Sequence, residues 1–526
     1  MKKNIFLTLL SGLLFALSWP TYGFPLLIFF AFIPLLFIEQ DYYENKHKKH
    51  FFLYIYLAFF VWNSITTWWV WNSTPFGGVF AIVVNSFLMG LTFWLFHFVR
   101  KRVPDRMAYV FFPVMWLSFE KFHLNWDFSW PWLNLGNVFS EHTALVQWYE
   151  YTGFFGGGLW ILTVNVLLFF SLGKYFKIKQ KKLLYQAFIK AIFWMGVPII
   201  FSLILFRQYE EKGNAAKVLL LQPNLDPWKE KFKYNNKELA EDLLQLAENK
   251  NDFELLMAPE TAISRSTDLP YFSNTEAYNI LHDYALMHSK TAILTGVDFV
   301  QWYRNQDKVP ESANQYKNRK IWYDLYNSAV LIDASKDFKV YHKSKLVVGA
   351  EYTPFRKVLK PILGDIMISL GGSMGTHVKQ EKRTVFKVAY SDIKVAPIIC
   401  YESIYGEYVT DYVKNGANLL GIITNDGWWG KTQGYKQHLS YARLRAVENR
   451  RDVLQAANTG ISAHIDQKGE IIDFLDYEIR GSLSANVRLN ETKTFYSKHG
   501  DYIARVSVFL AVLLFLYSFA RKRLRL

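Results

Sequence analysis

Cysteine is nearly absent from this sequence, because Cys400 is the only one among 526 residues. A single thiol excludes an intramolecular disulfide, and it excludes a metal site built from several cysteines. Cys400 ends the apolar run 395–399, which has the pattern of a buried strand. Such a residue is either a small buried hydrophobe or a nucleophile, and the first is the commoner explanation of an isolated cysteine.

Charge is also scarce, at 20% of residues, whereas 51% are hydrophobic and 18% are aromatic. The mean hydropathy is nevertheless only +0.03. A very apolar part is therefore averaged with an ordinary soluble part, and the apolar runs gather toward the two ends of the chain. A length of 526 residues predicts two or more folding units.

Eight runs are apolar enough to cross the roughly 30 Å hydrocarbon core of a bilayer as helices. They lie near 4–19, 24–38, 52–71, 78–99, 108–122, 157–173, 190–206 and 503–520. The first two are joined by the short turn 20–23 and predict a helical hairpin. The first run follows Lys2 and Lys3 and is also compatible with a signal peptide, although no small-residue cleavage site follows it.

Lysine and arginine are missing from the connections near 20–23 and 72–77. They gather instead in five clusters, at 2–3, 46–49, 100–102, 174–182 and 521–525. Eight crossings place all five clusters on one side of the membrane, as the positive-inside rule requires. Both termini are then expected in the cytoplasm and residues 207–502 on the opposite side. The placement of lysine and arginine on one side of the membrane therefore explains much of the net charge of +15. Because the charge has this explanation, it does not indicate nucleic-acid binding.

The sequence predicts three parts. Residues 1–206 form a bundle of seven transmembrane helices with a Trp-rich interfacial loop at 123–156, residues 207–502 form an outer domain, and residues 503–526 form an eighth helix with a basic tail. Strand-like runs alternate with helical patterns in the outer domain, which indicates a layered α/β fold. The strands are expected at 218–221, 253–258, 291–297, 328–332, 384–388, 393–399, 419–423 and 453–456, and the helices near 236–249, 274–288, 405–415 and 435–450.

Three polar residues end or follow strands of this domain: Glu260, Lys343 and Cys400. Open α/β sheets place their sites at the carboxyl ends of strands, so these side chains are expected to converge. A thiol needs a base to become a strong nucleophile, and Glu260 is the candidate base. Lys343 and the backbone N–H of Tyr401 are candidates for stabilising an oxyanion. Taken singly, Glu260 is also explained as a helix cap, and Lys343 is more simply explained as one of many solvated lysines.

Together with their flanking residues, these positions resemble the nitrilase superfamily, and the whole chain closely resembles its membrane branch, the apolipoprotein N-acyltransferases. The blocks that carry this resemblance occur in the order expected for that family. They are Ala258-Pro259-Glu260-Thr261-Ala262, Lys343-Ser344-Lys345-Leu346-Val347, Glu351-Tyr352-Thr353-Pro354, Cys400-Tyr401-Glu402, Thr424-Asn425-Asp426-Gly427-Trp428-Trp429-Gly430, Gln437-His438-Leu439, Ala442-Arg443, Glu448-Asn449-Arg450-Arg451 and Ala457-Asn458-Thr459-Gly460-Ile461.

The resemblance implies an αββα sandwich in which Glu260 is the general base, Lys343 stabilises the oxyanion and Cys400 is the nucleophile. It implies that Glu351 is a second glutamate that holds the lysine. The other supporting positions that it implies are Tyr401, Glu402, Asn327 and Trp228, the last beside the substrate entrance. Trp228 is also explained as a ring packed in an interface.

One stretch departs from the family pattern, since Val348-Gly349-Ala350 stands where Pro-Phe-Gly is usual. The spacing from Lys343 to Glu351 is kept, so a change in loop rigidity is expected rather than a loss of catalysis. A competing Gly-x-Ser-x-Gly motif at 371–375 matches serine hydrolases, but a poor amphipathic helix follows it. We therefore interpret residues 364–380 as a glycine-rich lid. His377 and His438 lack metal-ligand spacing, so neither a metal nor another cofactor is expected.

The implied reaction is ping-pong acyl transfer at the bacterial inner membrane, with the outer domain in the periplasm. Cys400 accepts an acyl chain from a membrane phospholipid, and the thioester passes it to the α-amine of the S-diacylglyceryl cysteine of an apolipoprotein. A monomeric enzyme is expected. A membrane-tethered amidase acting on a small amide would use the same three residues without needing eight crossings. A transporter is disfavoured because the apolar runs hold few central charges.

Overall fold

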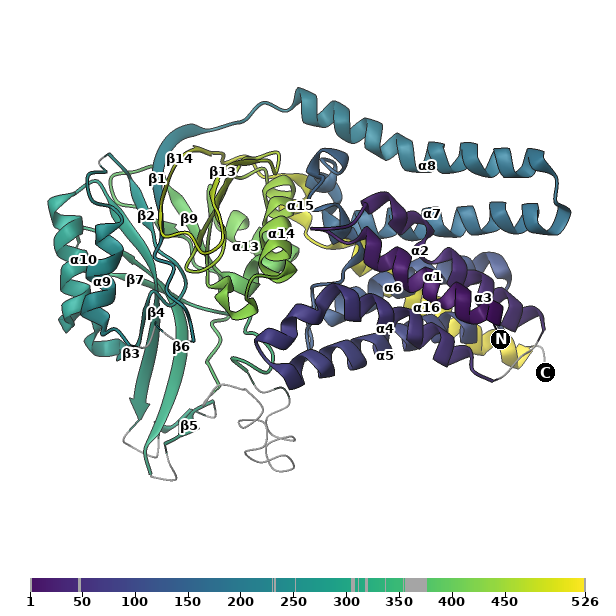
Figure 1. Ribbon diagram of the computed structural model, residues 1–526, viewed down its shortest axis with the longest axis horizontal. Coiled ribbons are helices and arrows are strands. Elements are labelled where there is room, and N and C mark those ends of the chain that lie inside the picture. Colours follow the sequence, from purple (N-terminus) through teal and green to yellow (C-terminus); the bar gives the residue numbers. More distant parts are fainter. Residues whose placement is uncertain are drawn as a thin grey trace. The chain divides into compact units, whose positions relative to one another are not determined.

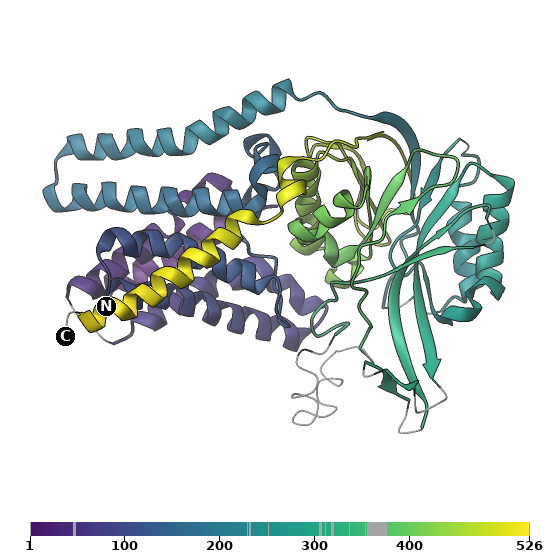
Figure 2. The ribbon, with the colours of Figure 1, turned by 180° about the vertical axis from the view of Figure 1, so that it is seen from behind.

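The computed structural model describes residues 2–45, 49–228, 230, 233–250, 252–303, 308–310, 312–316, 320–335, 337–352, 354 and 376–524. The chain forms two compact units (Figures 1 and 2). The first unit contains Met1–Trp71, Phe76–Gln208 and His499–Leu526, and the second contains Asn72–Pro75 and Tyr209–Lys498.

The first unit is a helical bundle with an apolar, strongly aromatic interior. Its elements are α1 (Lys2–Ser18), η1 (Pro25–Leu27), α2 (Ile28–Ala31), α3 (Ile33–Glu44), α4 (Phe51–Thr67), η2 (Trp68–Asn72), α5 (Pro75–Arg100), α6 (Asp105–His123), η3 (Leu135–Phe139), η4 (Thr143–Leu145), α7 (Tyr149–Ile178), α8 (Lys181–Gln208) and α16 (Tyr502–Leu524). The C-terminal helix α16 packs against α6, and Figure 2 shows it in yellow along one face of the bundle.

Six helical segments in the described part of the chain are long and apolar enough to cross a membrane. They are Pro25–Glu44, Phe51–Asn72, Pro75–Arg100, Tyr149–Ile178, Lys181–Gln208 and Tyr502–Arg521. The two other helices expected to cross are present but fall outside this group. Helix α1 has only 17 residues, and α6 has 19 residues with charged side chains in its first and last turns. The structure therefore has several apolar helices, and the expected count of eight spans is not confirmed.

Helix α8 contains Pro198, which has no N–H to give to the carbonyl of Trp194 one turn earlier. The indole N–H of Trp160 on α7 donates to that carbonyl at 2.8 Å. Ser202, one turn after the proline, donates its hydroxyl to the carbonyl of Ala144 at 2.8 Å. These two bonds fasten α8 to the rest of the bundle where its own hydrogen-bond ladder is interrupted.

The second unit is a sandwich of two β-sheets. The larger sheet has the order β14-β1-β2-β4-β6-β5, with β3 pairing with β4 and β7 pairing with β6, and the smaller has the order β13-β12-β11-β10-β9-β8. The strands are β1 (Asn214–Gln222), β2 (Leu255–Met257), β3 (Ile263–Asp268), β4 (Ala292–Tyr303), β5 (Asn314–Gln315), β6 (Trp322–Ile332), β7 (Lys339–His342), β8 (Phe386–Lys387), β9 (Lys394–Ile399), β10 (Leu419–Thr424), β11 (Val453–Ala457), β12 (Ser462–Ile465), β13 (Ile471–Leu475) and β14 (Gly481–Leu489).

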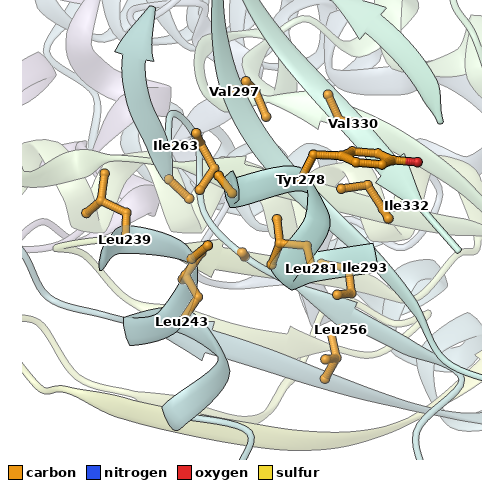
Figure 3. Close-up of a cluster of buried hydrophobic side chains, with 14 of the residues drawn as sticks. Leu239, Leu243, Leu256, Ile263, Tyr278, Leu281, Ile293, Val297, Val330 and Ile332 are labelled. Carbon is orange, nitrogen blue, oxygen red and sulfur yellow. The ribbon is translucent and has the colours of Figure 1, made fainter. Parts of the chain in front are cut away.

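Helices cover the outer faces of both sheets, which gives four layers (Figure 1). Helices α9 (Asn236–Gln245) and α10 (Glu276–Met287) cover the larger sheet, and α13 (Gly406–Lys414) and α14 (Gln433–Asn449) cover the smaller one. Buried leucine and isoleucine side chains join the first pair of helices to their sheet (Figure 3). The remaining elements are η5 (Leu269–Asn274), η7 (Cys400–Ile404), η8 (Asp426–Trp429) and α15 (Phe495–His499).

Two glycines allow close approaches that shape this domain. A Cβ on Gly421 of β10 would lie 2.7 Å from Cγ2 of Val395 and 2.9 Å from Cε of Met257 in the opposite sheet. A Cβ on Gly296 of β4 would lie 2.3 Å from the backbone nitrogen of Thr261, beside Glu260. The first glycine sets how tightly the sheets pack, and the second sets the path of the chain at Glu260.

Candidate functional site

Cys400 lies where β9 ends and the short helix η7 begins. Strand β9 is parallel to β10, and Ile399 pairs with Ile423 at the carboxyl ends of both strands. Cys400 has φ +47°, a left-handed conformation that is uncommon for a non-glycine residue, and its side chain is buried, with the residue 7% exposed. The sharp strand-to-helix turn therefore presents the thiol at the strand ends, as the sequence predicts.

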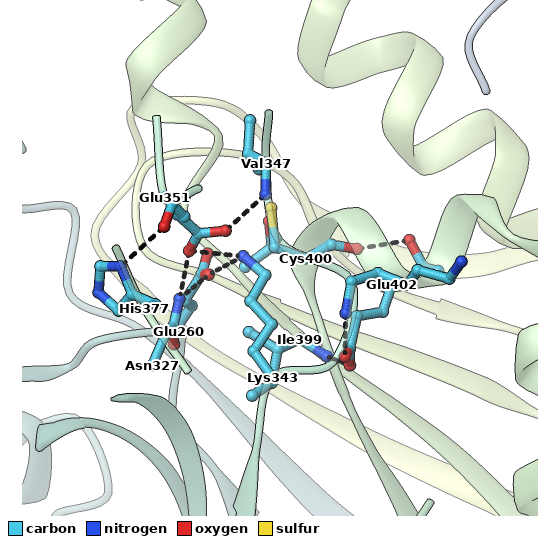
Figure 4. Close-up of polar contacts among 12 residues, drawn as sticks. Glu260, Asn327, Lys343, Val347, Glu351, His377, Ile399, Cys400 and Glu402 are labelled. Atoms are coloured by element: carbon cyan, nitrogen blue, oxygen red, sulfur yellow. Dashed lines mark hydrogen bonds and ion pairs between the residues drawn. The ribbon is translucent and has the colours of Figure 1, made fainter. Parts of the chain in front are cut away.

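Lys343 and Glu260 meet beside Cys400, as Figure 4 shows. The ammonium of Lys343 lies 2.9 Å from Oε1 of Glu260 and 3.0 Å from Oε1 of Glu351. Asn327 on β6 donates from Nδ2 to the same two oxygens, at 2.7 Å and 2.9 Å. Strands β6 and β7 bring Asn327 and Lys343 together, because the backbone N–H of Lys343 donates to the carbonyl of Asn327 at 2.8 Å. Four of the expected residues thus form one buried network.

The two carboxylates keep Lys343 charged although its side chain is only 1% exposed. Burial lowers the pKa of Lys343, but Glu260 and Glu351 raise it well above its usual value. For Glu351 the directions are reversed. Burial raises its pKa, but Lys343 and the backbone N–H of Val347 bring it below the usual value. Glu351 is therefore ionised, and it holds the Lys343 ammonium through Oε1 while its Oε2 accepts from the backbone N–H of Val347.

The Cys400 thiol is protonated at rest. Burial and the Glu260 carboxylate raise the pKa of Cys400 well above its ordinary value, and the positive charge of Lys343 opposes them only in part. A buried thiol of this kind does not supply its own thiolate at neutral pH. It reacts only when a neighbouring base removes the proton during attack, and Glu260 is a carboxylate beside it.

Glu402 fastens the lysine loop to the cysteine turn. Its Oε1 accepts from the backbone N–H groups of Ser344 at 2.6 Å and Lys345 at 3.2 Å, and its Oε2 accepts from that of Ile399 at 2.9 Å. The hydroxyls of Tyr341 and Tyr408 also donate to Oε1, at 2.8 Å and 2.6 Å. One buried side chain therefore fixes the residues next to Lys343 and next to Cys400.

Tyr401 and Trp228 lie at different depths. Tyr401 is buried and packs edge-on against Tyr405, with ring centroids 5.3 Å apart. Trp228 is 60% exposed and forms a T-shaped pair with Trp428 at 4.8 Å. Trp428 belongs to η8, which directly follows β10. The structure thus puts Trp228 on the surface beside the η8 loop, outside the buried network of Glu260 and Lys343.

The stretch that departs from the family pattern forms a tight turn. Gly349 has φ +82°, a conformation that favours glycine, and its N–H donates to the carbonyl of Tyr352 at 2.9 Å. The turn brings the side chain of Glu351 close to Val347, and the backbone N–H of Val347 donates to Oε2 of Glu351 at 2.8 Å. The Gly-x-Ser-x-Gly motif at 371–375 and most of the expected lid at 364–380 lie outside the described residues.

A second polar cluster, which the sequence reasoning missed, lies under the cysteine turn. His438 on α14 and Asp426 at the start of η8 are both fully buried, with Nδ1 and Oδ1 3.0 Å apart. Nε2 of His438 lies 3.1 Å from the carbonyl oxygen of Cys400. A signal was available, because Asp426 follows the apolar strand 419–424 just as Cys400 follows 395–399.

The fold and the site define a protein with a bundle of apolar helices and an αββα domain that carries a buried cysteine, lysine and glutamate just after the carboxyl ends of three strands. Residues 11–167 match the family described as Apolipoprotein N-acyltransferase N-terminal domain, and residues 218–496 match the family described as Carbon-nitrogen hydrolase. The chain therefore belongs to the carbon-nitrogen hydrolase family, in the branch that also carries this N-terminal domain.

Several relatives match along the whole chain. The Apolipoprotein N-acyltransferase of Chlorobaculum tepidum is 29% identical over 542 residues, which cover 99% of this chain and 98% of that protein. Apolipoprotein N-acyltransferase 1 of Treponema denticola is 26% identical, over 97% of this chain and 95% of that protein. Among solved structures, Nit3 of Saccharomyces cerevisiae, from branch 10 of the nitrilase superfamily, is 16% identical and covers 53% of this chain and 92% of its own, with a TM-score of 0.37.

Proposed function

We propose that this protein is an apolipoprotein N-acyltransferase that carries the acyl chain on Cys400. The observation that carries the proposal is the buried contact of Lys343 with Glu260 and Glu351 beside the only cysteine of the chain. Relatives that match along the full length bear the name Apolipoprotein N-acyltransferase, and they support the transfer of an acyl chain rather than hydrolysis of a small amide.

In the first half-reaction, Sγ of Cys400 attacks the ester carbonyl of a membrane phospholipid while Glu260 takes the thiol proton. The carbonyl oxygen becomes an oxyanion, which the ammonium of Lys343 and the backbone N–H of Tyr401 stabilise. The tetrahedral intermediate then expels the lysophospholipid oxygen, which takes the proton back from Glu260. A thioester on Cys400 and a free lysophospholipid result.

In the second half-reaction, the α-amine of an S-diacylglyceryl cysteine attacks the thioester. Glu260 takes a proton from the amine, and the same two donors stabilise the second oxyanion. The C–S bond breaks, the proton returns to the thiol of Cys400, and the acyl chain remains on the lipoprotein as an amide. Water would compete with the amine at this stage, so a dry site favours transfer over hydrolysis.

The bundle suits two lipid-anchored substrates, and we propose that it crosses the inner membrane eight times. Helices α1 and α6 must cross together with the six long segments if all basic clusters are to share one side. If α1 and α6 did not cross, the Lys and Arg residues at 100–102 and those at 174–182 would face opposite compartments, against the positive-inside rule. Eight crossings put both termini in the cytoplasm and the sandwich domain in the periplasm. The enzyme is proposed to act as a monomer.

The test is intact mass spectrometry of the purified protein after incubation with phospholipid alone, beside Cys400→Ala. The expected result is one added acyl mass on the natural protein, absent from the variant and removed by a diacylated lipopeptide that gains the same mass. An adduct that only water removes would support the amidase alternative. If no phospholipid gives an adduct, the phospholipid-donor proposal is wrong.

A further inference from the structure

The ring of His438 under the nucleophile is placed to donate two hydrogen bonds, one to Asp426 and one to the backbone of Cys400. Nδ1 of His438 faces the carboxylate oxygen of Asp426 at 3.0 Å, and Nε2 faces the backbone carbonyl of Cys400 at 3.1 Å. Both neighbours are acceptors, and a ring that carries protons on both nitrogens donates to both of them. Burial lowers the pKa of His438, but Asp426 and the bond to Cys400 raise it above the usual value, in agreement with a charged ring.

The same carbonyl has a second donor in Ser403 of η7. The hydroxyl of Ser403 donates to the Cys400 oxygen at 2.8 Å and lies 2.9 Å from Nε2 of His438. Asp426 is in turn anchored by the hydroxyl of Thr424, which donates to its Oδ1 at 2.7 Å. The carbonyl of Cys400 is therefore held by two buried side chains, one of them tied through Asp426 to the end of β10.

Holding this carbonyl fixes the oxyanion donor, because both belong to one peptide group. The peptide between Cys400 and Tyr401 is trans, so its C=O and N–H point in opposite directions. When His438 and Ser403 bind the oxygen, the N–H of Tyr401 points away from them. Cys400 itself is left-handed, at φ +47°, a conformation that persists only where the surroundings enforce it.

We infer that His438, oriented by Asp426, is a positioning residue that locks the Cys400–Tyr401 peptide so that the N–H of Tyr401 serves as the oxyanion donor. This inference rests on the proposed function, because it assigns a task within the acylation of Cys400. His438 acts through the peptide group and does not itself touch the reacting atoms. Its removal should therefore impair reactions that form an oxyanion and spare those that do not.

In the full-length protein, two reactions of Cys400 distinguish a loss of oxyanion stabilisation from a general loss of thiol reactivity. Acylation by phospholipid passes through an oxyanion, whereas alkylation by iodoacetamide displaces iodide from carbon and forms none. His438→Asn lacks a donor at the position of Nε2, and the longer His438→Gln restores one there. We expect acyl-adduct formation to be about 100-fold slower in His438→Asn than in His438→Gln, the effect of losing one oxyanion donor, whereas the two variants lose the same ring charge and should be alkylated at the same rate. His438→Gln should recover most of the acylation rate.

Two controls guard against a loss of folding. His464 and Asp452 form another buried pair, 2.9 Å apart, in which His464 lies on β12 opposite Leu454 near the start of β11. His464→Asn should leave the acylation rate unchanged. If His438→Asn does not fold, Ser403→Ala removes the second donor and should slow acylation by about tenfold, roughly the effect of one neutral hydrogen bond, and again spare alkylation.

The inference would be overturned if alkylation and acylation were slowed equally in His438→Asn relative to His438→Gln, or if the two variants had equal acylation rates. So would an unchanged acylation rate in both His438→Asn and Ser403→Ala. Failure of the proposed function looks different, because the natural protein would then alkylate at Cys400 and yet form no acyl adduct with phospholipid.

Discussion

Side chains of opposite charge act on the ionisation of the Cys400 thiol, and Glu260 and Lys343 have the largest effects among them. The Glu260 carboxylate disfavours a neighbouring thiolate and the Lys343 ammonium favours it. We predict that Glu260→Gln moves the midpoint of the pH–alkylation profile to lower pH, because a negative charge that raises the thiol pKa is gone. Lys343→Met should move the midpoint to higher pH. The rate of iodoacetamide modification, followed by intact mass across pH, measures both shifts.

The acyl-adduct assay should respond differently to the same variants. Glu260→Gln makes the thiol easier to ionise but removes the base, so acylation should fall by about 10²- to 10⁴-fold. A base role for Glu260 would be contradicted by an acylation rate that rises with the lower thiol pKa. Midpoints that move in the same direction in both variants would contradict the charge arrangement.

At this scale the sequence was most informative about residues that follow strands. Glu260, Lys343 and Cys400 could be predicted to converge, because each ends or follows a strand and α/β folds place their sites at the carboxyl ends of strands. The sequence did not show that the three strands belong to two different sheets. The contacts of Glu402 with Tyr341 and Tyr408 could not be predicted, since they join side chains of different elements, 61 and 6 positions apart, that meet only through packing. His438 stands in a block that carries the family resemblance and lacks metal-ligand spacing, but its bond to a backbone oxygen leaves no pattern in the sequence.

Strand β4 approaches the Glu260 turn most closely at Gly296. Gly296 donates its N–H to the carbonyl of Pro259 at 3.0 Å, and a Cβ there would lie 2.3 Å from backbone atoms that cannot rotate away. We predict that Gly296→Ala pushes Glu260 from Lys343 and lowers the acylation rate by at least tenfold, since small misplacements of catalytic groups are costly. Gly481→Ala on β14 is the matched control, because its Cβ would meet only ordinary contacts near 3.7 Å. Equal activity of the two variants would contradict the prediction.

The two sheets approach each other at Gly421. Gly421→Ala would press a methyl group against Val395 and Met257, at 2.7 Å and 2.9 Å. Overpacking of this kind costs about 1–3 kcal/mol, so the variant should unfold at a lower temperature. The thermal midpoint of the full-length protein measures this effect, again against Gly481→Ala. A midpoint equal to that of the natural protein would mean that the sheets can separate without cost.

The strands that could be predicted from the sequence are those that consist of one continuous apolar run. Strands β2, β9, β10 and β11 are short apolar runs, and the sequence placed all of them within a few residues. Strands β4 and β6 extend well beyond the expected 291–297 and 328–332, because their outer halves, near Trp302 and Trp322, are partly exposed and lack the apolar run. Strands β3 and β5 are polar or very short, and their pairing partners, not their own residues, make them strands.

The sidedness of the whole molecule can be tested because the chain has one cysteine. Cys400→Ala leaves a cysteine-free protein into which single cysteines are introduced. Tyr390, which is 83% exposed in the sandwich domain, and Lys101, between α5 and α6, are suitable positions. In spheroplasts, an impermeant maleimide should label Tyr390→Cys, whereas Lys101→Cys should react only after the membrane is opened. The reverse pattern would contradict the proposed topology.

At the same scale, hydropathy separates the apolar bundle from the rest of the chain, and the alternation of strand and helix patterns indicates the α/β domain. The number of membrane-spanning helices could not be predicted from hydropathy, because α1 is short and α6 carries charged residues in its end turns. Length and composition cannot decide whether such helices cross. The distribution of lysine and arginine is the stronger argument, because it concerns the loops rather than the helices.

The pairing of β1 with β14 has a consequence for how such a protein can be assembled from parts. These are the first and last strands of the sandwich, and they run antiparallel from Asn214 opposite Leu489 to Gln222 opposite Gly481. The domain's two ends therefore meet at one seam, and inserted domains are best tolerated where their ends lie close together. The sandwich is a module spliced between two helices of a membrane protein. It could be exchanged for another at that seam without rerouting a single strand or reordering the helices on either side.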